Sequence, residues 1–510
     1  MKKYLETHAF LSIIAVALVL RLFVFLYSQP WEHSWDNRVL YTGDPFEYLT
    51  LARSLVERHE FSVTWPEPMP NGVRTPGYPL FLSLTCQGQT NLMWISVLAQ
   101  VVLDSLFSGL FAVIATRCFR SHKVGILSGF LYAVFPDAVF WPTQIFPESI
   151  GVWFAVGGVG LLERFASGNC KHFWQQTTFA LSGCLLLGLA VLIKPNWLFL
   201  PFVAAIWISY HIISRPQGSR IILTGALCIL FAPMTSWVCW NKYNWGNWTI
   251  NYGSVMFKES ISSSLINKNG SSEIPISKVW SDEMKLQALV PDFNEKHFVP
   301  PSFLRVTTWN KDSLSRDTAR VNQQYKRVIL ENFPEYLKMH AGGIAYLLFS
   351  PGSNFVAKAL DPKFEMKDSS ANFATSQKSL VEILHARLLD VDASWLAISW
   401  TGLTLAYLCV LYLFSLIFAG IFYTRGFSAS LLGGPWLIYV LVSGISIILI
   451  GAGGTSRYRY GLVAAMIPYA SFAIIFAIEH LRKMIFPKSS SDLTLSSKMA
   501  NSVCKGCQLG

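Results

Sequence analysis

The chain has 510 residues, of which 52% are hydrophobic and only 14% are charged, and its formal net charge is +11. A soluble domain carries roughly 25% charged residues, so the composition excludes a compact water-soluble protein of this size. Excess positive charge on a soluble chain would suggest nucleic acid, but on a membrane chain it is typical of basic cytoplasmic loops. The sequence therefore predicts a membrane protein with no nucleic-acid partner.

Long apolar segments recur along the chain, and a membrane-spanning helix needs about 20 such residues. The first segment follows two lysines and has no small-residue cleavage site after it, so we expect a retained anchor rather than a signal peptide. The predicted spans are residues 8–28, 92–116, 124–141, 149–166, 174–193, 197–213, 220–239, 394–423, 432–452 and 461–480.

The basic residues predict how these spans are oriented. With a cytoplasmic N-terminus, every short cytoplasmic loop is basic, as the positive-inside rule requires. The C-terminal tail, with Arg482, Lys483 and Lys488, then also lies in the cytoplasm. Two large loops, at 30–91 and 241–393, are left on the extracytoplasmic side together with most of the residues capable of chemistry.

These features predict an all-α polytopic membrane protein with about ten transmembrane helices. We expect amphipathic surface helices in the first outer loop and a small α-rich domain in the long loop, where a helical pattern covers 318–348. The predicted units are an N-terminal membrane module at 1–240 with the first outer loop at 30–91, an extracytoplasmic loop domain at 241–393, C-terminal membrane helices at 394–482 and a disordered cytoplasmic tail at 483–510.

The first outer loop contains a candidate catalytic carboxylate at the start of a predicted amphipathic helix. Apolar residues between 48 and 56 repeat at helical spacing, which is typical of a helix on the membrane surface. Asp44 and Glu47 lie three residues apart on one face of this helix. A carboxylate there could accept a proton from an acceptor group or hold a metal ion. Helix capping by Asp44, with Pro45 in the first turn, also explains the acids, and the two roles are compatible.

Some basic residues fall on the predicted outer side, against the positive-inside bias, and four of them lie in turns beside predicted spans or helices. Arg74 begins the rigid turn 74–79, whose two prolines fix the backbone and whose glycine permits a positive φ. Lys194 follows the fifth span, and Arg457 and Arg459 lie in the last outer turn. Snorkelling to the interface alone explains Lys194 or the Arg457 and Arg459 pair, and the turn at Arg74 could simply direct the chain back to the bilayer. Together they indicate a site for an anion such as phosphate or pyrophosphate.

Glu148 begins the fourth predicted span, directly after a proline. The helix dipole favours an acid at this position, although Glu148 could also face Asp44 across an outer vestibule. The ten histidines have no ligand spacing. A catalytic metal, if there is one, would therefore rest on Asp44 and Glu148 and would be a divalent cation of the Mg or Mn type.

Short motifs follow one another in a recognisable order. They are G-D-x-x-x-Y-x-x-x-A at 43–52, R-T-P-G-Y-P-L at 74–80, P-E at 147–148, K-P-N at 194–196, W-N-x-x-x-W-G at 240–246, N-F-P-E-Y-L at 332–337 and S-R-Y-R at 456–459. This order resembles that of polytopic glycosyltransferases of the GT-C superfamily. More narrowly, it resembles bacterial relatives of protein O-mannosyltransferases and of the lipid A aminoarabinose transferase.

The resemblance implies transfer of a sugar from a polyprenyl-phosphate donor to a lipid, glycan or protein acceptor of the cell envelope. It places the reaction on the outer face of a bacterial inner membrane, with inversion at the anomeric carbon. Asp44 would be the general base and Glu148 a second catalytic acid. The donor phosphate would be neutralised by Arg74, Lys194, Arg457 and Arg459. The other predicted substrate-binding residues are Glu47, Tyr48 and Tyr78. Some relatives carry adjacent acids in the first loop, a pattern that this chain lacks, so the resemblance leaves metal binding open.

A transporter or flippase of an anionic lipid-linked saccharide is the alternative from a different class. Such a protein should carry ionisable residues or broken helices at mid-membrane depth. Asp104 is nearly the only acid inside an apolar run, whereas charges gather on one outer face. The sequence therefore favours an enzyme over a transporter. An outer-face polysaccharide polymerase or ligase is a further alternative within the same fold family.

Overall fold

The computed structural model of the protein describes most of the apolar segments and the turns between them. The described residues are 2–32, 43–65, 67–70, 72, 74–167, 173–213, 219–250, 322–323, 325–350, 356, 395–425, 434–450 and 456–485. Most of the predicted loop domain at 241–393 lies outside these ranges, and so does the predicted tail beyond residue 485.

Eight described helices are long and apolar enough to cross a membrane, and a bent pair makes a ninth candidate. The eight spans are formed by α1 (Lys2–Ser28), α4 (Met93–Cys118), α7 (Glu148–Ala166), α8 (Phe173–Ile193), α9 (Leu200–Ile213) together with the 3-10 helix η4 (Pro195–Trp197) before it, α10 (Ser219–Trp245), α19 (Trp395–Arg425) and α21 (Tyr460–Ile485). A shorter apolar helix, α20 (Trp436–Ile450), covers the ninth predicted segment. Each of the ten predicted segments is thus helical, and the predicted polytopic helical fold is confirmed.

The third predicted span is broken rather than continuous. It consists of α5 (His122–Val134), α6 (Pro136–Phe140) and the short 3-10 helix η3 (Trp141–Thr143), with a bend of 60°. Phe135 at the break is extended, with φ −62° and ψ 119°. A residue that precedes a proline disfavours the helical conformation, so Pro136 accounts for the break.

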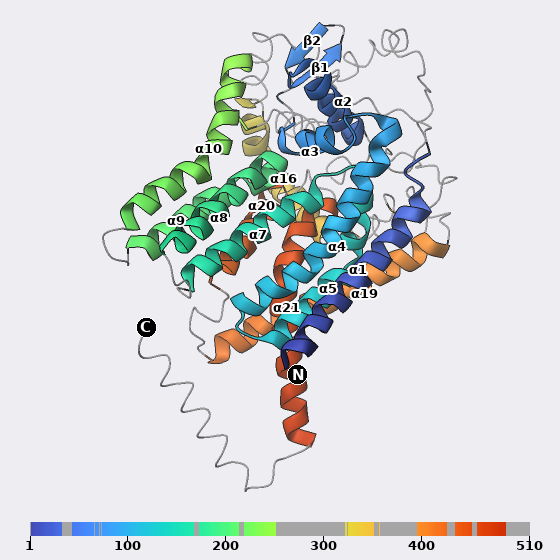
Figure 1. Ribbon diagram of the computed structural model, residues 1–510, viewed down its shortest axis with the longest axis vertical. Coiled ribbons are helices and arrows are strands. Elements are labelled where there is room, and N and C mark those ends of the chain that lie inside the picture. The colour runs from blue at the N-terminus through green and yellow to red at the C-terminus, as the bar shows by residue number, and fades with distance from the viewer. Residues whose placement is uncertain are drawn as a thin grey trace.

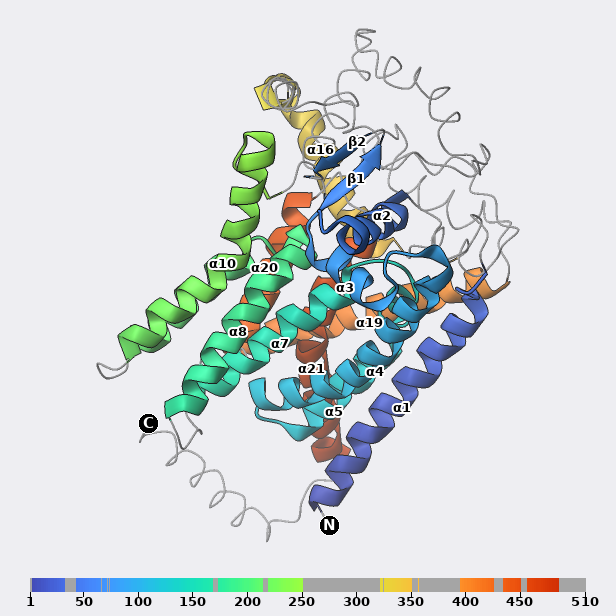
Figure 2. The same ribbon diagram turned by 45° about the horizontal axis from the view of Figure 1, so that its top comes forward.

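The first loop forms two helices and a small sheet at one end of the bundle. Helices α2 (Gly43–Arg58) and α3 (Gly77–Thr85) lie at the end opposite the N-terminus (Figures 1 and 2). Between them, β1 (Ser62–Trp65) pairs antiparallel with β2 (Glu67–Pro70), a hairpin that the helical prediction did not include. The amphipathic pattern of α2 is confirmed, because Tyr48, Leu49 and Ala52 belong to a buried apolar cluster with residues of α3 and the adjoining spans.

The long helices pack so that several turns meet at the α2 end of the bundle. On one side α1 lies against α4 and α5, and on the other α7 lies against α8, which also packs on α10 (Figure 2). Helix α21 contacts α5, α19 and α20. Its first turn is preceded by the 3-10 helix η7 (Ser456–Arg459), which touches α16 (Phe333–Phe349), while η4 (Pro195–Trp197) follows α8.

The turn at 74–79 is docked directly onto the end of α8. A Cβ atom on Gly77 would lie 2.8 Å from the backbone of Leu192 and Ile193, and the Thr75 hydroxyl donates to the carbonyl of Ile193 at 3.5 Å. Gly77 is not among the described residues with positive φ, so the expected conformational role is wrong. The glycine is needed for close approach, which holds the turn after Arg74 against the end of α8.

Candidate functional site

Asp44 lies between two arginines from distant parts of the chain. Arg74 Nη2 is 2.5 Å from Asp44 Oδ1, and Arg457 Nη2 is 2.6 Å from Asp44 Oδ2. Burial raises the pKa of Asp44, but the two guanidinium groups outweigh this effect and hold the pKa well below its usual range. Asp44 is therefore ionised and, while both arginines contact it, only weakly basic.

Glu148 and Lys194 extend this ion-pair chain on the other side of Arg457. Lys194 Nζ donates to Glu148 Oε1 at 2.8 Å, and Arg457 Nε lies 3.6 Å from the same oxygen. Burial lowers the pKa of Lys194, although the charge of Glu148 opposes this shift. Arg457 thus joins the two predicted catalytic acids.

The other predicted residues of the first loop hold Arg74 in position. Glu47 is fully buried and accepts a hydrogen bond from Arg74 Nε. The Arg74 guanidinium carbon lies 5.2 Å from the ring centre of Tyr48, which packs edge to face on Tyr78 at 4.9 Å. Tyr78 in turn donates to Gln100 at 3.1 Å. Tyr48 and Tyr78 therefore form a rigid aromatic support beneath Arg74.

We call this set the ion-pair cluster: Asp44, Glu47, Arg74, Glu148, Lys194 and Arg457. Asp44 is 21% exposed and each of its two arginines is 16% exposed, whereas Glu47 and Glu148 are buried. An anion from solvent therefore meets the arginines and Asp44 first. The aromatic rings of Phe146 and Tyr458 lie 4.8 and 5.4 Å from the Arg457 guanidinium. Neither ring was identified from the sequence.

Arg459 is not brought into the cluster. It is fully buried, donates to both oxygens of Asp137 at 2.9 and 3.1 Å, and also donates to the carbonyl of Ser350 after α16. A 3-10 helix has three residues per turn, so side chains two positions apart point in different directions. Arg457 and Arg459 therefore face different neighbours although both lie in η7.

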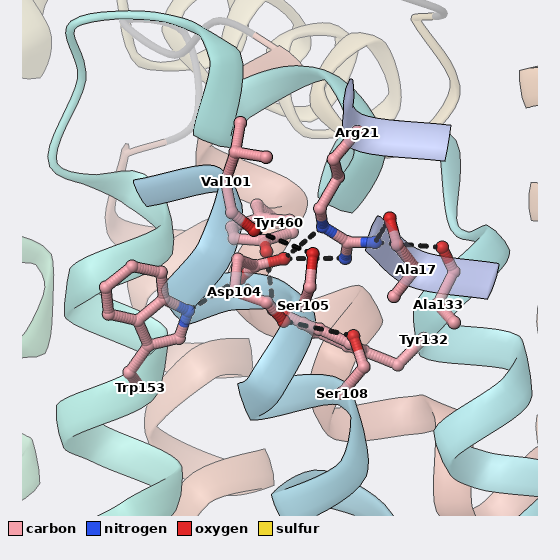
Figure 3. Close-up of polar contacts among 10 residues, drawn as sticks. All are labelled: Ala17, Arg21, Val101, Asp104, Ser105, Ser108, Tyr132, Ala133, Trp153 and Tyr460. Atoms are coloured by element: carbon pink, nitrogen blue, oxygen red, sulfur yellow. Dashed lines mark hydrogen bonds and ion pairs between the residues drawn. The ribbon is translucent and has the colours of Figure 1, made fainter. Parts of the chain in front are cut away.

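A second polar network lies inside the bundle and was largely missed by sequence analysis. Arg21 of α1 pairs with Asp104 of α4 at 2.6 Å, and both side chains are fully buried (Figure 3). Asp104 also accepts hydrogen bonds from Tyr132 at 3.0 Å and Trp153 at 2.5 Å. The Tyr132 hydroxyl is 2.6 Å from that of Tyr460, the first residue of α21. The sequence did contain a signal for this network, because Arg21 and Asp104 are charged residues within predicted apolar spans.

The arrangement of the carboxylates does not fit a divalent cation. Among the described residues, no group of three or more His, Cys, Asp or Glu side chains is placed to hold a metal ion. Both oxygens of Asp44 face arginines, and Glu148 Oε1 faces Lys194 and Arg457. These cations would repel Mg²⁺ or Mn²⁺ at the same oxygens.

No protein-family model and no curated protein matches the sequence. Among solved structures, the chain is similar to the archaeal oligosaccharyltransferase AglB from Archaeoglobus fulgidus in complex with an inhibitory peptide and a dolichol-phosphate. The identity is 14%, the TM-score is 0.50, and the match covers 98% of this chain and 54% of that chain. ArnT from Cupriavidus metallidurans bound to undecaprenyl phosphate is similar at 11% identity and a TM-score of 0.37, over 94% of this chain and 81% of that chain.

The likeness to AglB concerns the fold. This chain has the fold of that archaeal oligosaccharyltransferase over almost its whole length. It spans about half the length of the archaeal protein, since the match covers 54% of that chain. With eight candidate membrane spans in its described part, the protein is a multi-pass membrane protein.

Proposed function

We propose that the protein is a membrane glycosyltransferase that uses a polyprenyl-phosphate sugar as its donor. The observation that carries this proposal is that Asp44 forms ion pairs with both Arg74 and Arg457 at one end of a bundle with the GT-C fold. The positive-inside pattern supports an active site on the extracytoplasmic face of a bacterial inner membrane, with both termini in the cytoplasm. The acceptor is an envelope lipid, glycan or protein.

The cations of the cluster stabilise the leaving group in this proposal. When the bond between the anomeric carbon and the phosphate oxygen breaks, the bonding electrons stay with the polyprenyl phosphate. Arg74 and Arg457 present guanidinium groups to solvent beside Asp44, and Lys194 lies one ion pair further along. Fixed cations aimed at developing charge lower the barrier without reorganisation. Glu47 and Glu148 keep these cations in place.

Asp44 is the proposed general base. The donor phosphate competes with Asp44 for the guanidinium groups of Arg74 and Arg457, so donor binding frees the carboxylate and raises its basicity. Asp44 then takes the proton of the acceptor hydroxyl or amine while the acceptor atom attacks the anomeric carbon from the face opposite the phosphate. The products are the inverted glycoside, protonated Asp44 and polyprenyl phosphate. Glu148 is proposed as the second acid of the site.

The test of this proposal is Asp44→Asn in protein reconstituted with polyprenyl-phosphate sugars. We expect sugar transfer to fall by about 10²- to 10⁴-fold, the usual contribution of a general base, while donor binding persists. Glu57→Gln, at an exposed position on the same helix, is the matched control and should leave transfer unchanged. Full transfer by the Asp44→Asn protein would overturn the base assignment.

Two structural features favour a flippase of a lipid-linked saccharide as a second candidate. The bundle contains a broken helix at Phe135 and a buried ion pair between Arg21 and Asp104. However, the polar groups at both places already have partners within the protein. Asp104 accepts hydrogen bonds from three side chains, and Asp137 beside the break pairs with Arg459. This pairing leaves them less suited to bind a passing saccharide, so the enzyme is the preferred candidate. Lipid translocation across vesicles without any sugar transfer would support the flippase instead.

A further inference from the structure

Asp104 is a buried charged residue in the middle of a membrane-spanning helix. It lies near the centre of α4 and pairs with Arg21 of α1, and both side chains are fully buried (Figure 3). Replacing a buried ion pair by apolar residues of similar volume is often neutral or stabilising, so stability alone explains this pair poorly. Ionisable residues inside membrane spans usually serve a function. The other contacts of Asp104 indicate what that function is.

One arm of the network runs from Asp104 to the residue that follows η7. The Tyr132 hydroxyl of α5 donates to Asp104 Oδ1 at 3.0 Å. A tyrosine hydroxyl has a single hydrogen, so the oxygen of Tyr132 is left to accept from the Tyr460 hydroxyl 2.6 Å away. The ring of Tyr460 also stacks on Phe135 at 5.7 Å. Asp104 thus fixes the first residue of α21, which lies three positions after Arg457 in the chain.

A second arm runs from Asp104 to the helix that begins with Glu148. Trp153 of α7 donates from Nε1 to Asp104 Oδ1 at 2.5 Å (Figure 3). This bond lies within the first two turns of α7 and therefore fixes the direction in which Glu148 faces. Glu148 Oε1 is 3.6 Å from Arg457 Nε, and Tyr460 lines the same small pocket as these two residues. The two arms therefore meet at Arg457.

We propose that Asp104 is a positioning residue for Arg457. It holds the guanidinium at the outer site through Tyr460, which follows in the chain, and through Glu148, which faces Arg457 Nε. The proposal rests on the proposed function, because there Arg457 binds the donor phosphate. A cation that is already fixed needs no ordering when the phosphate arrives. Displacement of such a group by about 1 Å can cost a reaction about 10²-fold. Arg21 compensates the buried charge of Asp104.

The test uses Tyr460→Phe, because Asp104→Asn leaves the buried charge of Arg21 without a carboxylate and compromises folding. Phenylalanine keeps the ring of Tyr460 and removes only its hydroxyl. Undecaprenyl phosphate is titrated in detergent onto the wild type, Tyr460→Phe, Arg457→Met and the double variant, up to concentrations that saturate Arg457→Met. We expect Tyr460→Phe to weaken binding by about 2- to 10-fold, as for one neutral hydrogen bond, but to have no effect once Arg457 is methionine. Trp153→Phe should behave in the same way.

The matched control is Tyr407→Phe, which should leave binding unchanged. The Tyr407 hydroxyl also joins two helices, by donating to the carbonyl of Leu131 at 3.0 Å, but it has no contact with Asp104. Equal weakening by Tyr460→Phe with and without Arg457 would show a general loosening of the bundle and overturn the positioning role. Unchanged affinity in both Tyr460→Phe and Trp153→Phe would overturn it as well. In either case the proposed function stands, whereas it fails if the wild type does not bind the lipid.

Discussion

The two arginines of η7 are expected to have different roles, Arg457 in donor binding and Arg459 in the stability of the fold. The substitution Arg459→Met tests this assignment. Arg459 and Asp137 are both buried, and the pair is joined by two hydrogen bonds. Removing one partner of such a pair costs about 3–5 kcal/mol, because the other charge stays buried and alone. The carbonyl of Ser350 also loses its donor. We therefore expect Arg459→Met to be strongly destabilised.

Arg457→Met should cost much less stability. Without Arg457, Asp44 keeps Arg74 and Glu148 keeps Lys194, so no acid of the cluster is left alone. The cost is then closer to that of ordinary hydrogen bonds to charged groups, about 1.5–3 kcal/mol. Donor affinity should nevertheless fall, because Arg457 is one of the two partly exposed guanidinium groups beside Asp44.

Thermal unfolding in detergent and binding of undecaprenyl phosphate distinguish the two variants. We expect Arg459→Met to unfold at a clearly lower temperature, and the double change Arg459→Met with Asp137→Leu to recover much of the loss, since a buried pair can be replaced by apolar residues. Arg457→Met should lower the unfolding temperature less than Arg459→Met does but should bind the lipid weakly. If Arg459→Met is as stable as wild type and loses lipid affinity, the assignment of Arg459 to folding is wrong.

The same contacts predict three further outcomes. Burial lowers the pKa of Lys194, so its ammonium group loses its charge at a lower pH than that of an ordinary lysine as the pH is raised. Donor affinity should decline with this loss of charge, and Lys194→Arg should abolish the decline in a binding titration. The pKa of Asp44 lies well below its usual range, so the contribution of its ion pairs to stability is fully present above about pH 4. This contribution should be lost as the pH falls further. Asp44→Asn should flatten this part of the curve of unfolding temperature against pH. Asp104→Leu should cost about 3–5 kcal/mol by leaving the buried charge of Arg21 without a carboxylate. Unfolding temperatures should show recovery when Arg21→Met is added.

The residues of the cluster could be identified in the sequence because they lie at segment ends, whereas their roles in binding and catalysis stay predictions. Once spans and loops are counted, Asp44, Arg74, Glu148, Lys194 and Arg457 must all fall at one end of the bundle. Acids at helix starts and basic residues against the positive-inside bias then identify them without any knowledge of helix packing. The fold class follows from the same count of apolar segments.

The parts that sequence analysis missed depend on how helices pack against one another. The pairing of Arg21 with Asp104 requires that α1 and α4 lie side by side in one register. The direction of Arg459 depends on the 3-10 geometry of η7 and on the approach of Ser350, which is far away in the sequence. Periodicity identifies neither neighbours nor rotation about a helix axis, so these contacts needed the structure.

The charge balance of the cluster links its stability to the proposed chemistry. Three carboxylates face three cations, so the site is compensated when no donor is bound. A donor phosphate adds a negative charge, and Asp44 is the acid with which it competes most directly, because Glu47 and Glu148 are buried behind their partners. Loss of its arginine contacts raises the basicity of Asp44 at the moment when the sugar is in place. The proposed base is thus restrained until the donor arrives, which disfavours proton abstraction from an acceptor in its absence.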